Sequence, residues 1–305
     1  MKDARAAIAD NRLGRRDAAT LGRTIGDYVA LTKPRLNILV VATSAAGYYL
    51  GAPGPLNFPA MAAAVSGTAL VAGGSAALNQ VYERDTDAMM RRTRMRPLPD
   101  GRVPASDARV FGIVLSAAGL LMLGTLVNLP ATALALATLI VYLVIYTPMK
   151  RRSPMATLVG AVPGALPPLI GWVAAHGGVN AGGAALFLIV FLWQIPHFMA
   201  IAWLYRDDYG KAGFPMLPVI EPDGRRTGRQ AVAYAAALVP ASLVPAVIGL
   251  SGSVYAAVAL VLGIALVWLA ARFALRRNDS AARWLFLSSI AYLPILWIVM
   301  MADKL

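Results

Sequence analysis

The hydrophobic residues of this chain lie in long runs that are separated by shorter polar segments. Each run is long enough to cross the roughly 30 Å hydrocarbon core of a bilayer as a helix. The pattern therefore predicts an all-α, polytopic membrane protein with nine transmembrane helices. The predicted helices lie near residues 36–54, 59–79, 107–127, 131–148, 155–175, 182–204, 230–249, 252–273 and 283–302.

Lysine and arginine are distributed unevenly between the two sides of these predicted helices. Placing the N-terminus in the cytoplasm puts segments 80–106, 149–154, 205–229 and 274–282 inside. Together with the N-terminal tail and the adjoining helix ends, these segments hold every lysine and arginine except Lys304. Basic residues concentrate in cytoplasmic loops. The bias thus predicts a multi-pass protein of the cell inner membrane, with its C-terminus on the outer, periplasmic side.

Composition narrows the classes of function. The chain is 58% hydrophobic and only 14% charged, which is too little charge for a soluble domain of 305 residues. A net charge of +13 would suggest nucleic acid in a soluble protein, but the bias toward the inner side explains most of it, so no nucleic-acid partner is expected. The chain has no cysteine, which excludes disulfides and thiolate chemistry. Its two histidines, His176 and His197, are too few for a multi-histidine metal site.

The first 35 residues differ from the rest of the chain. Residues 1–35 are basic and polar and lack the apolar run of a signal peptide before Leu36. They are predicted to form a cytoplasmic tail, with a surface-lying helix near residues 25–31, and residues 36–305 are predicted to form one nine-helix domain. The long inside segments carry carboxylates among their bases, whereas the outside loops are short. Chemistry is therefore expected at the cytoplasmic face.

A cluster of oxygen-bearing side chains follows the second predicted helix. Asn79, Glu83 and Asp87 are spaced i, i+4, i+8, so they share one face if the helix continues through them. Two carboxylates on one face repel each other unless a cation lies between them. Mg²⁺ favours one or two protein carboxylates together with substrate phosphates. The spacing therefore favours a Mg²⁺ platform.

A second acidic cluster follows the sixth predicted helix on the same side of the membrane. Asp207 and Asp208 are adjacent there and lie between Arg206 and Lys211. A third element, residues 150–152, is entirely basic, and it would serve either as a topology signal or as a phosphate contact. The physical interpretation is a diphosphate held by Mg²⁺ on the acidic segments and by the basic side chains. The alternative is that these are ordinary charged loops whose acids pair with nearby arginines.

Longer motifs extend this pattern over nearly the whole chain from Leu31. They are Leu31-Thr32-Lys33-Pro34-Arg35, Asn79 to Asp87 with Arg91–Pro99, Tyr146-Thr147-Pro148-Met149-Lys150-Arg151, Pro163–Trp172, and Trp193-Gln194-Ile195-Pro196-His197-Phe198 running on to Tyr205–Gly213. In the order and spacing of these motifs the chain closely resembles the protohaem IX farnesyltransferases (haem O synthases) of the UbiA-type intramembrane prenyltransferase superfamily. The resemblance implies nine helices around a central cavity. It also implies transfer of the farnesyl group of farnesyl diphosphate, with addition of water, onto a vinyl group of protohaem IX (haem B) to make haem O.

The resemblance also implies roles for individual residues. The two Asp-rich motifs of the superfamily bind Mg²⁺ and the isoprenoid diphosphate, and here the metal is expected on Asn79, Glu83, Asp87, Asp207 and Asp208. The residues expected to be catalytic are Asn79, Glu83, Asp87 and Asp208. The diphosphate is expected to contact Arg91, Arg94, Arg96, Lys150, Arg151 and Lys211. His197 is expected to bind haem iron, with packing inside its helix as the alternative, and a haem A synthase is the downstream partner that such a reaction suggests.

The chain departs from the superfamily pattern in two places. Glu83 and Gln80 stand where aspartate is common. The second motif has adjacent Asp207 and Asp208, whereas the superfamily spaces two aspartates four residues apart. The adjacency leaves open which of the two binds metal, and Asp208 is favoured.

Two other functions fit parts of this pattern. A sister prenyltransferase would use the same diphosphate site with an aromatic or quinone-precursor acceptor. A secondary transporter would place polar residues and broken helices near the bilayer midplane in both halves of the chain. The acidic clusters lie instead at cytoplasmic helix ends among bases, which suits a phosphate head group better.

Overall fold

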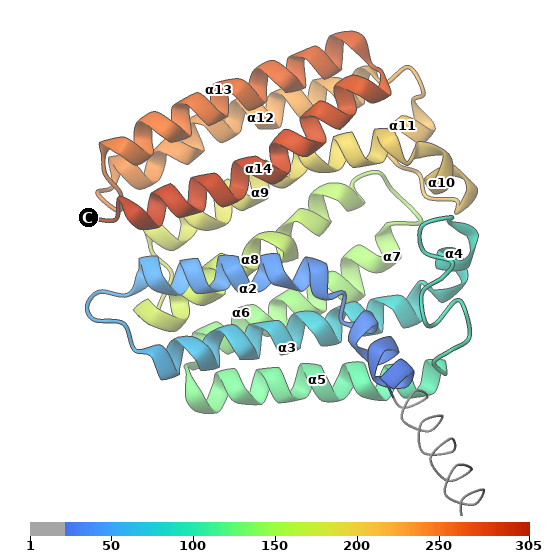
Figure 1. Ribbon diagram of the computed structural model, residues 1–305, viewed down its shortest axis with the longest axis horizontal. Helices are drawn as coiled ribbons and strands as arrows, with labels where there is room; N and C mark the ends of the chain where they lie inside the picture. The colour runs from blue at the N-terminus through green and yellow to red at the C-terminus, as the bar shows by residue number, and fades with distance from the viewer. Residues whose placement is uncertain (1–21) are drawn as a thin grey trace, which may run out of the picture.

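The computed structural model describes residues 22–305, and these residues are almost entirely helical (Figure 1). Nine helical stretches of the described chain run side by side as one bundle. Their bounds are α2 (Pro34–Gly51), α3 (Phe58–Tyr82), α5 (Ala105–Leu126), the continuous run of α6 (Leu129–Ile140), η1 (Val141–Tyr146) and α7 (Thr147–Met149), α8 (Ala156–His176), α9 (Ala181–Leu204), α12 (Arg225–Val247), α13 (Ser253–Arg276) and α14 (Asp279–Ala302).

Eight of these nine stretches are long and apolar enough to cross a membrane. The remaining one, α2, is 18 residues long and carries the polar residues Arg35 and Asn37 in its first turn, which lower its hydropathy. Each end lies within five residues of the predicted position. The predicted all-α, polytopic membrane architecture is therefore confirmed.

The short helices gather at one end of the bundle. These are α4 (Arg84–Met89), α10 (Arg206–Lys211) and α11 (Leu217–Ile220), and they lie with α7 at the right of Figure 1. We call this the polar end. The C-terminus and the tight connections between the long helices lie at the opposite end. Both acidic segments predicted to carry the chemistry are therefore at the same end of the bundle.

Glycines bring α2 and α8 into direct backbone contact. A Cβ atom on Gly47 would lie 2.0 Å from the carbonyl oxygen of Pro168, and one on Gly171 would lie 1.9 Å from that of Ser44. No side chain fits at either position, which is how small residues serve helix packing in membranes. The second half of α2 is thereby fixed relative to α8.

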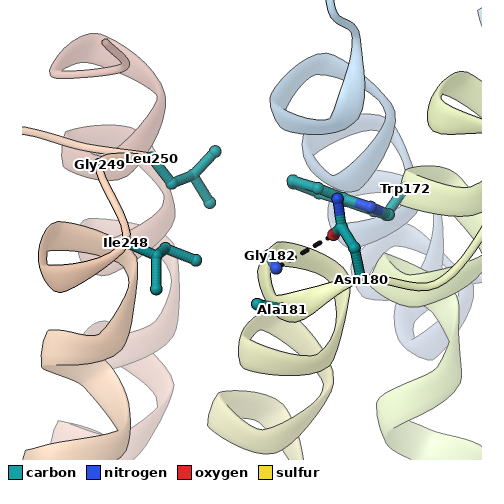
Figure 2. A pocket seen from close by; sticks show the side chains of 7 residues that line it. All are labelled: Trp172, Asn180, Ala181, Gly182, Ile248, Gly249 and Leu250. Carbon is teal, nitrogen blue, oxygen red and sulfur yellow. Dashed lines mark hydrogen bonds between the residues drawn. The ribbon is translucent and has the colours of Figure 1, made fainter.

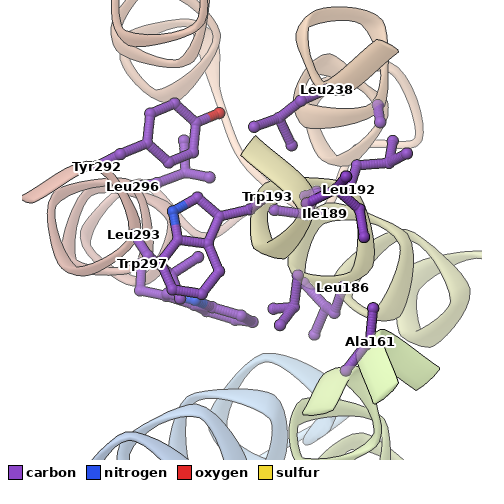
Figure 3. Packing of buried hydrophobic residues seen from close by; sticks show 14 of the residues in the cluster. Ala161, Leu186, Ile189, Leu192, Trp193, Leu238, Tyr292, Leu293, Leu296 and Trp297 are labelled. Carbon is purple, nitrogen blue, oxygen red and sulfur yellow. The ribbon is translucent and has the colours of Figure 1, made fainter. Parts of the chain in front are cut away.

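Helix α9 lies at the centre of the largest apolar cluster. Its residues Leu186, Ile189 and Trp193 are buried and pack toward Leu238 of α12 and Trp297 of α14 (Figure 3). The indole Nε1 of Trp193 also donates a hydrogen bond of 2.8 Å to the Ser289 carbonyl of α14. Because α9 is held by α8, α12 and α14, its interior polar residues are rigidly placed.

The exceptional position of Lys304 has a structural explanation. Its ammonium donates hydrogen bonds to the carbonyls of Tyr49 (2.8 Å) and Ala52 (3.0 Å), at the end of α2. A basic side chain there satisfies carbonyls that have no helical donor. The neighbouring Asp303 accepts a hydrogen bond from the backbone N–H of Tyr255 in the first turn of α13. The chain end therefore ties α2 to α13.

The described part of the N-terminal segment is helical over residues 22–31, which confirms the helix predicted near residues 25–31. Leu31 is fully buried, the ring of Tyr28 packs edge-on against Phe111 at 5.1 Å, and Asp27 pairs with Arg102 at 3.0 Å. The rest of the predicted tail lies outside the described residues. The boundary between residues 35 and 36 stays a prediction.

Candidate active site

The first acidic segment spans the junction between α3 and α4. The backbone N–H of Glu83 donates to the carbonyl of Asn79 (2.9 Å), and that of Asp87 donates to the carbonyl of Glu83 (2.8 Å). Helical hydrogen bonding therefore continues across the junction, and the three side chains share one face. All three are buried, with 0%, 8% and 1% of their surface exposed. Buried groups of this kind require polar or charged partners.

Each residue of this face has a basic partner from a different part of the chain. Lys150 Nζ lies 2.8 Å from Glu83 Oε1, and an arginine nitrogen of Arg96 lies 2.7 Å from Asp87 Oδ2. Lys33 Nζ donates to Asn79 Oδ1 at 3.2 Å. We call these six residues the charged cluster. It contains three bases and two carboxylates, so its basic groups outnumber its acidic groups and it can bind an additional anion.

The pKa values of the two lysines reflect this excess of basic groups. Burial, followed by the positive charges of Arg96 and Lys150, lowers the pKa of Lys33 from 10.5 to about 7. Burial also opposes the charge of Lys150, but Tyr146 and Glu83 outweigh it and raise the pKa of Lys150 above its ordinary value. An anion bound among these bases would favour the charged form of Lys33.

The amide of Asn79 is held by a π-helical segment. Its Nδ2 donates to Thr147 Oγ1 (3.1 Å), Thr147 Oγ1 donates to the carbonyl of Tyr142 (2.7 Å), and the Tyr142 hydroxyl lies 3.4 Å from Asn79 Oδ1. Tyr142 lies within η1 and Thr147 directly follows it. Short π-helical turns are frequent at functional sites. Here the wider turn brings both side chains to the same amide.

The second acidic segment is anchored by its neighbours, whereas its carboxylates are left free. Arg206 donates to the carbonyl of Trp203 (2.7 Å) and to Asp279 Oδ1 (2.9 Å), which fixes the start of α10 against α14. Asp207 is exposed and Asp208 half-buried, and within residues 22–305 neither forms an ion pair. Both carboxylates are therefore available to a ligand.

Arg92 joins the two acidic segments. Its guanidinium donates a hydrogen bond of 2.8 Å to the Tyr209 hydroxyl of α10, and it lies 5.0 Å from the ring centre of Tyr205 and 5.2 Å from that of Tyr209. Met90 also packs against Phe214 in a small apolar cluster. The loop that follows α4 is thus attached to α10, and the two segments face a common region at the polar end.

The donor chemistry of the two segments fits a hard cation. Asn79, Glu83 and Asp87 on one side and Asp207 and Asp208 on the other offer only oxygen ligands, as Mg²⁺ prefers. Among the described residues, no three acidic or histidine side chains converge closely enough to hold a metal alone. Mg²⁺ commonly completes its coordination with water and phosphate oxygens. The donor set therefore suits a cation that arrives with a phosphate-bearing ligand, and the five-residue metal set stays a prediction.

The other predicted phosphate contacts lie at the same end but outside the charged cluster. Arg91, Arg94, Arg151 and Lys211 are exposed, and none pairs with an acid of the part of the chain that the structure describes. Sequence reasoning gave no role to several residues that do reach the site. These residues are Lys33, Arg92, Tyr142 and Thr147. Lys33, Arg92 and Thr147 lie within motifs that carry the family resemblance, whereas Tyr142 lies in none of them.

His197 is oriented by α14. Its Nδ1 lies 2.8 Å from Ser289 Oγ, and Ser289 Oγ donates its only proton to the carbonyl of Phe286 at 2.6 Å. Nδ1 must therefore be the donor to Ser289, which leaves a lone pair on Nε2. The ring stacks on Trp193 with a centroid separation of 5.2 Å. Nε2 accepts no hydrogen bond within residues 22–305, so it is free to bind a ligand.

A cavity at the opposite end offers no comparable chemistry. It measures about 290 Å³ and lies between the end of α8, the start of α9 and the turn that follows α12 (Figure 2). Its polar side chain Asn180 already caps α9 by accepting a hydrogen bond of 3.1 Å from the Gly182 N–H. The remaining lining is mainly apolar. The chemistry of the described chain therefore concentrates at the polar end.

Two solved structures share this fold. A structure of digeranylgeranylglyceryl phosphate synthase superposes with a TM-score of 0.78 at 17% identity and covers 92% of this chain and 98% of its own. A UbiA homolog from Archaeoglobus fulgidus bound to GPP and Mg²⁺ superposes with a TM-score of 0.63 at 18% identity, covering 90% and 99%. At these identities the likeness establishes the fold alone.

Sequence comparison establishes the family. The profile of the UbiA prenyltransferase family matches residues 40–290. The protoheme IX farnesyltransferase of Solibacter usitatus is 46% identical over 287 residues, which cover 91% of this chain and 98% of that protein. The enzyme of the same name from Acidiphilium cryptum is 43% identical and covers 95% of this chain and 94% of its own. The chain therefore belongs to the UbiA prenyltransferase family, on its protoheme IX farnesyltransferase branch.

Proposed function

We propose that this chain transfers the farnesyl group of farnesyl diphosphate, with addition of water, onto a vinyl group of protohaem IX (haem B) to make haem O. The charged cluster is the observation that supports this reaction. It places buried oxygen ligands beside an excess of bases at one end of a membrane bundle. That is where a lipid-soluble chain with an anionic head group would present its diphosphate. The names of the relatives supply the acceptor.

The charged cluster would bind the diphosphate in a defined way. Asn79, Glu83 and Asp87, with Asp207 and Asp208 opposite, would hold Mg²⁺. The metal would neutralise the charge that develops on the diphosphate as the allylic C–O bond breaks. Lys150 and Arg96 would contact the phosphate oxygens and stabilise that charge more in the transition state than in the ground state. Outer contacts would come from Arg91, Arg94, Arg151 and Lys211.

His197 would hold the acceptor. A neutral imidazole with a free Nε2 is a suitable axial ligand for haem iron. Ser289 and Trp193 fix the orientation of the ring. Polar groups inside membrane helices are costly and are usually retained for function.

The orientation in the membrane follows from charge. All lysines and arginines of the described chain except Lys304 lie toward the polar end, which would therefore face the cytoplasm of an inner-membrane protein. The C-terminus would then be periplasmic. A haem A synthase as downstream partner stays a prediction.

Membranes containing this protein should convert haem B into a farnesylated, hydroxylated haem when farnesyl diphosphate and Mg²⁺ are supplied. Chelation of Mg²⁺ should reduce product to background, and added Mg²⁺ should restore it. Without the cation, the carboxylates of Glu83 and Asp87 repel the diphosphate. Mass spectrometry of extracted haems measures the product. Farnesyl transfer to a quinone precursor but not to haem would reject the acceptor assignment.

Replacing His197 with alanine should remove an axial ligand from bound haem B. We expect the Soret band of the haem complex to shift and haem affinity to fall by at least about tenfold. His176→Ala is the matched control, since that histidine lies at the opposite end and pairs with Asn180. An unchanged haem spectrum in folded His197→Ala would exclude ligation by this residue.

A further inference from the structure

Gln194 is a buried amide inside α9, with 5% of its surface exposed. Its Nε2 donates two hydrogen bonds of 3.1 Å, to the carbonyl of Ala161 in α8 and to that of Val190 in its own helix. A carbonyl oxygen can only accept a hydrogen bond, so the amide nitrogen must face these two carbonyls, and Oε1 is the other arm of the amide, against Gly164 of α8. The orientation of the amide is thereby fixed.

The amide oxygen of Gln194 lies in a gap that a glycine leaves in α8, and it has no donor there among the described residues. Oε1 occupies the space that a side chain at position 164 would fill, because a Cβ atom on Gly164 would lie 2.1 Å from it. Within residues 22–305 no group donates a hydrogen bond to Oε1, yet it is not one of the enclosed polar atoms that lack a partner. Oε1 therefore remains within reach of a water molecule.

Support of the backbone does not explain this glutamine. A proline within a helix removes the donor for the carbonyl four residues earlier. In α8 and α9 the carbonyls so affected are those of Val159, Pro163, Gly164 and Leu192. Gln194 donates to none of these four carbonyls. It donates instead to two carbonyls, one in α8 and one in α9, that already have helical donors. An apolar side chain would satisfy the helices equally well.

The position of Gln194 relates it to both substrate sites. The ring of Tyr146, which lies 4.5 Å from Lys150 Nζ, packs directly on Gly160. Gly164, beside the Gln194 amide, is one turn further into α8, about 6 Å along the helix. His197 lies three residues from Gln194 on α9, about 4.5 Å nearer the polar end. Gln194 thus lies about one helical turn deeper in the bundle than the charged cluster, and it is next to the proposed haem ligand.

We infer that Gln194 is a further catalytic residue, whose Oε1 holds the water molecule that adds to the carbocation formed on the haem side chain. This inference rests on the function proposed above. The amide accepts one hydrogen bond from the water and directs an oxygen lone pair toward the cation. A water held in this way reacts far faster than one that must diffuse in from the bilayer.

The reaction balances as follows. The C–O bond of farnesyl diphosphate breaks, and its electron pair leaves on the diphosphate. The π electrons of the vinyl group form the new C–C bond, which leaves a cation on the vinyl carbon attached to the porphyrin. The water oxygen forms a C–O bond to that carbon, and the released proton passes to the diphosphate. Without the water, the cation instead loses a proton from carbon and gives an alkene that is lighter by one water.

The test measures the ratio of hydroxylated to alkene product in membranes that contain the full chain. Gln194→Met removes the oxygen at similar volume and should raise the alkene fraction by at least about tenfold. Gln194→Glu, as the protonated acid that burial favours, keeps a carbonyl oxygen, can donate its O–H to one of the two carbonyls, and should retain part of the hydroxylated product. Gln194→Asn withdraws the oxygen by one methylene and should also raise the alkene fraction, which provides a second variant if the first fails to fold.

Asn128→Leu is the matched control. Its amide also donates to α8 carbonyls, those of Val173 (3.0 Å) and Ala174 (3.3 Å), but at the opposite end. It should lower the amount of folded protein and leave the product ratio unchanged. An unchanged ratio in Gln194→Met, or loss of both products in folded Met and Asn variants, would overturn the inference. A wild-type protein that makes no farnesylated haem would instead reject the proposed function.

Discussion

Asp87→Asn should lower farnesyl transfer by about 10²- to 10³-fold, the loss expected when a group that acts on transition-state charge is removed. Asp87 is 1% exposed and pairs with Arg96 at 2.7 Å. Asparagine has nearly the same shape but lacks the charge that would attract Mg²⁺. Transfer is measured as product formed at saturating farnesyl diphosphate and haem B, at several Mg²⁺ concentrations. A higher Mg²⁺ requirement would accompany the loss.

Two controls separate this effect from misfolding. Asp85→Asn changes the same residue type two positions away in α4, where the side chain is 89% accessible and, within residues 22–305, pairs only with exposed Arg84. It should keep near-normal transfer. Asp87→Asn leaves the charge of Arg96 without its partner. The double variant Asp87→Asn/Arg96→Gln removes that charge too, so its free energy of unfolding should exceed that of Asp87→Asn by about 1.5–3 kcal/mol, without any recovery of transfer. Normal transfer in Asp87→Asn would remove this carboxylate from the site.

The helices could be predicted because a bilayer permits few alternatives. Backbone polar groups in hydrocarbon must pair within the segment, so each long apolar run must be helical. The ends were less certain because hydropathy marks the membrane core rather than the helix. The helix predicted from residue 230 begins at Arg225, and the one predicted from residue 283 begins at Asp279. Their first turns are charged and extend beyond the apolar run.

The acidic face was predictable, whereas its partners were not. Spacing alone put Asn79, Glu83 and Asp87 on one side of a helix. Lys150, 67 residues from Glu83, pairs with it, and Lys33, 46 residues from Asn79, donates to it. Such pairings depend on how the helices pack, and a single sequence does not contain that register.

The second half of the site was harder to predict for the same reason. Nothing in the sequence distinguishes Arg92 from the other arginines of its run, yet Arg92 is the one that stacks on Tyr205 and Tyr209. Ser289 is one of two adjacent serines in an apolar stretch of α14, and only the contact of α14 with α9 gives it His197 as a neighbour. Residues whose role depends on an adjacent helix therefore escape pattern analysis.

Lys150→Met should reduce kcat/KM for farnesyl diphosphate by about 10²-fold or more, with a loss in kcat as well as a rise in KM. The ammonium lies 2.8 Å from Glu83 Oε1 and 4.5 Å from the Tyr146 ring centre. Because those neighbours raise the pKa of Lys150 above 10.5, it stays charged throughout the physiological range. Methionine keeps the aliphatic packing and removes the charge.

Comparison with a neighbouring base shows whether position or total charge matters. Arg152 is exposed two residues away, so Arg152→Met removes the same charge outside the charged cluster and should change kcat/KM less than about threefold, as expected for a screened surface charge. Lys150→Arg keeps the charge in a bulkier form and should recover part of the activity. Equal losses in the Lys150 and Arg152 methionine variants would show that the diphosphate responds to the general basic surface. A loss confined to Lys150 would place the head group at the charged cluster, where the ammonium of Lys150 meets the oxygen face at Glu83.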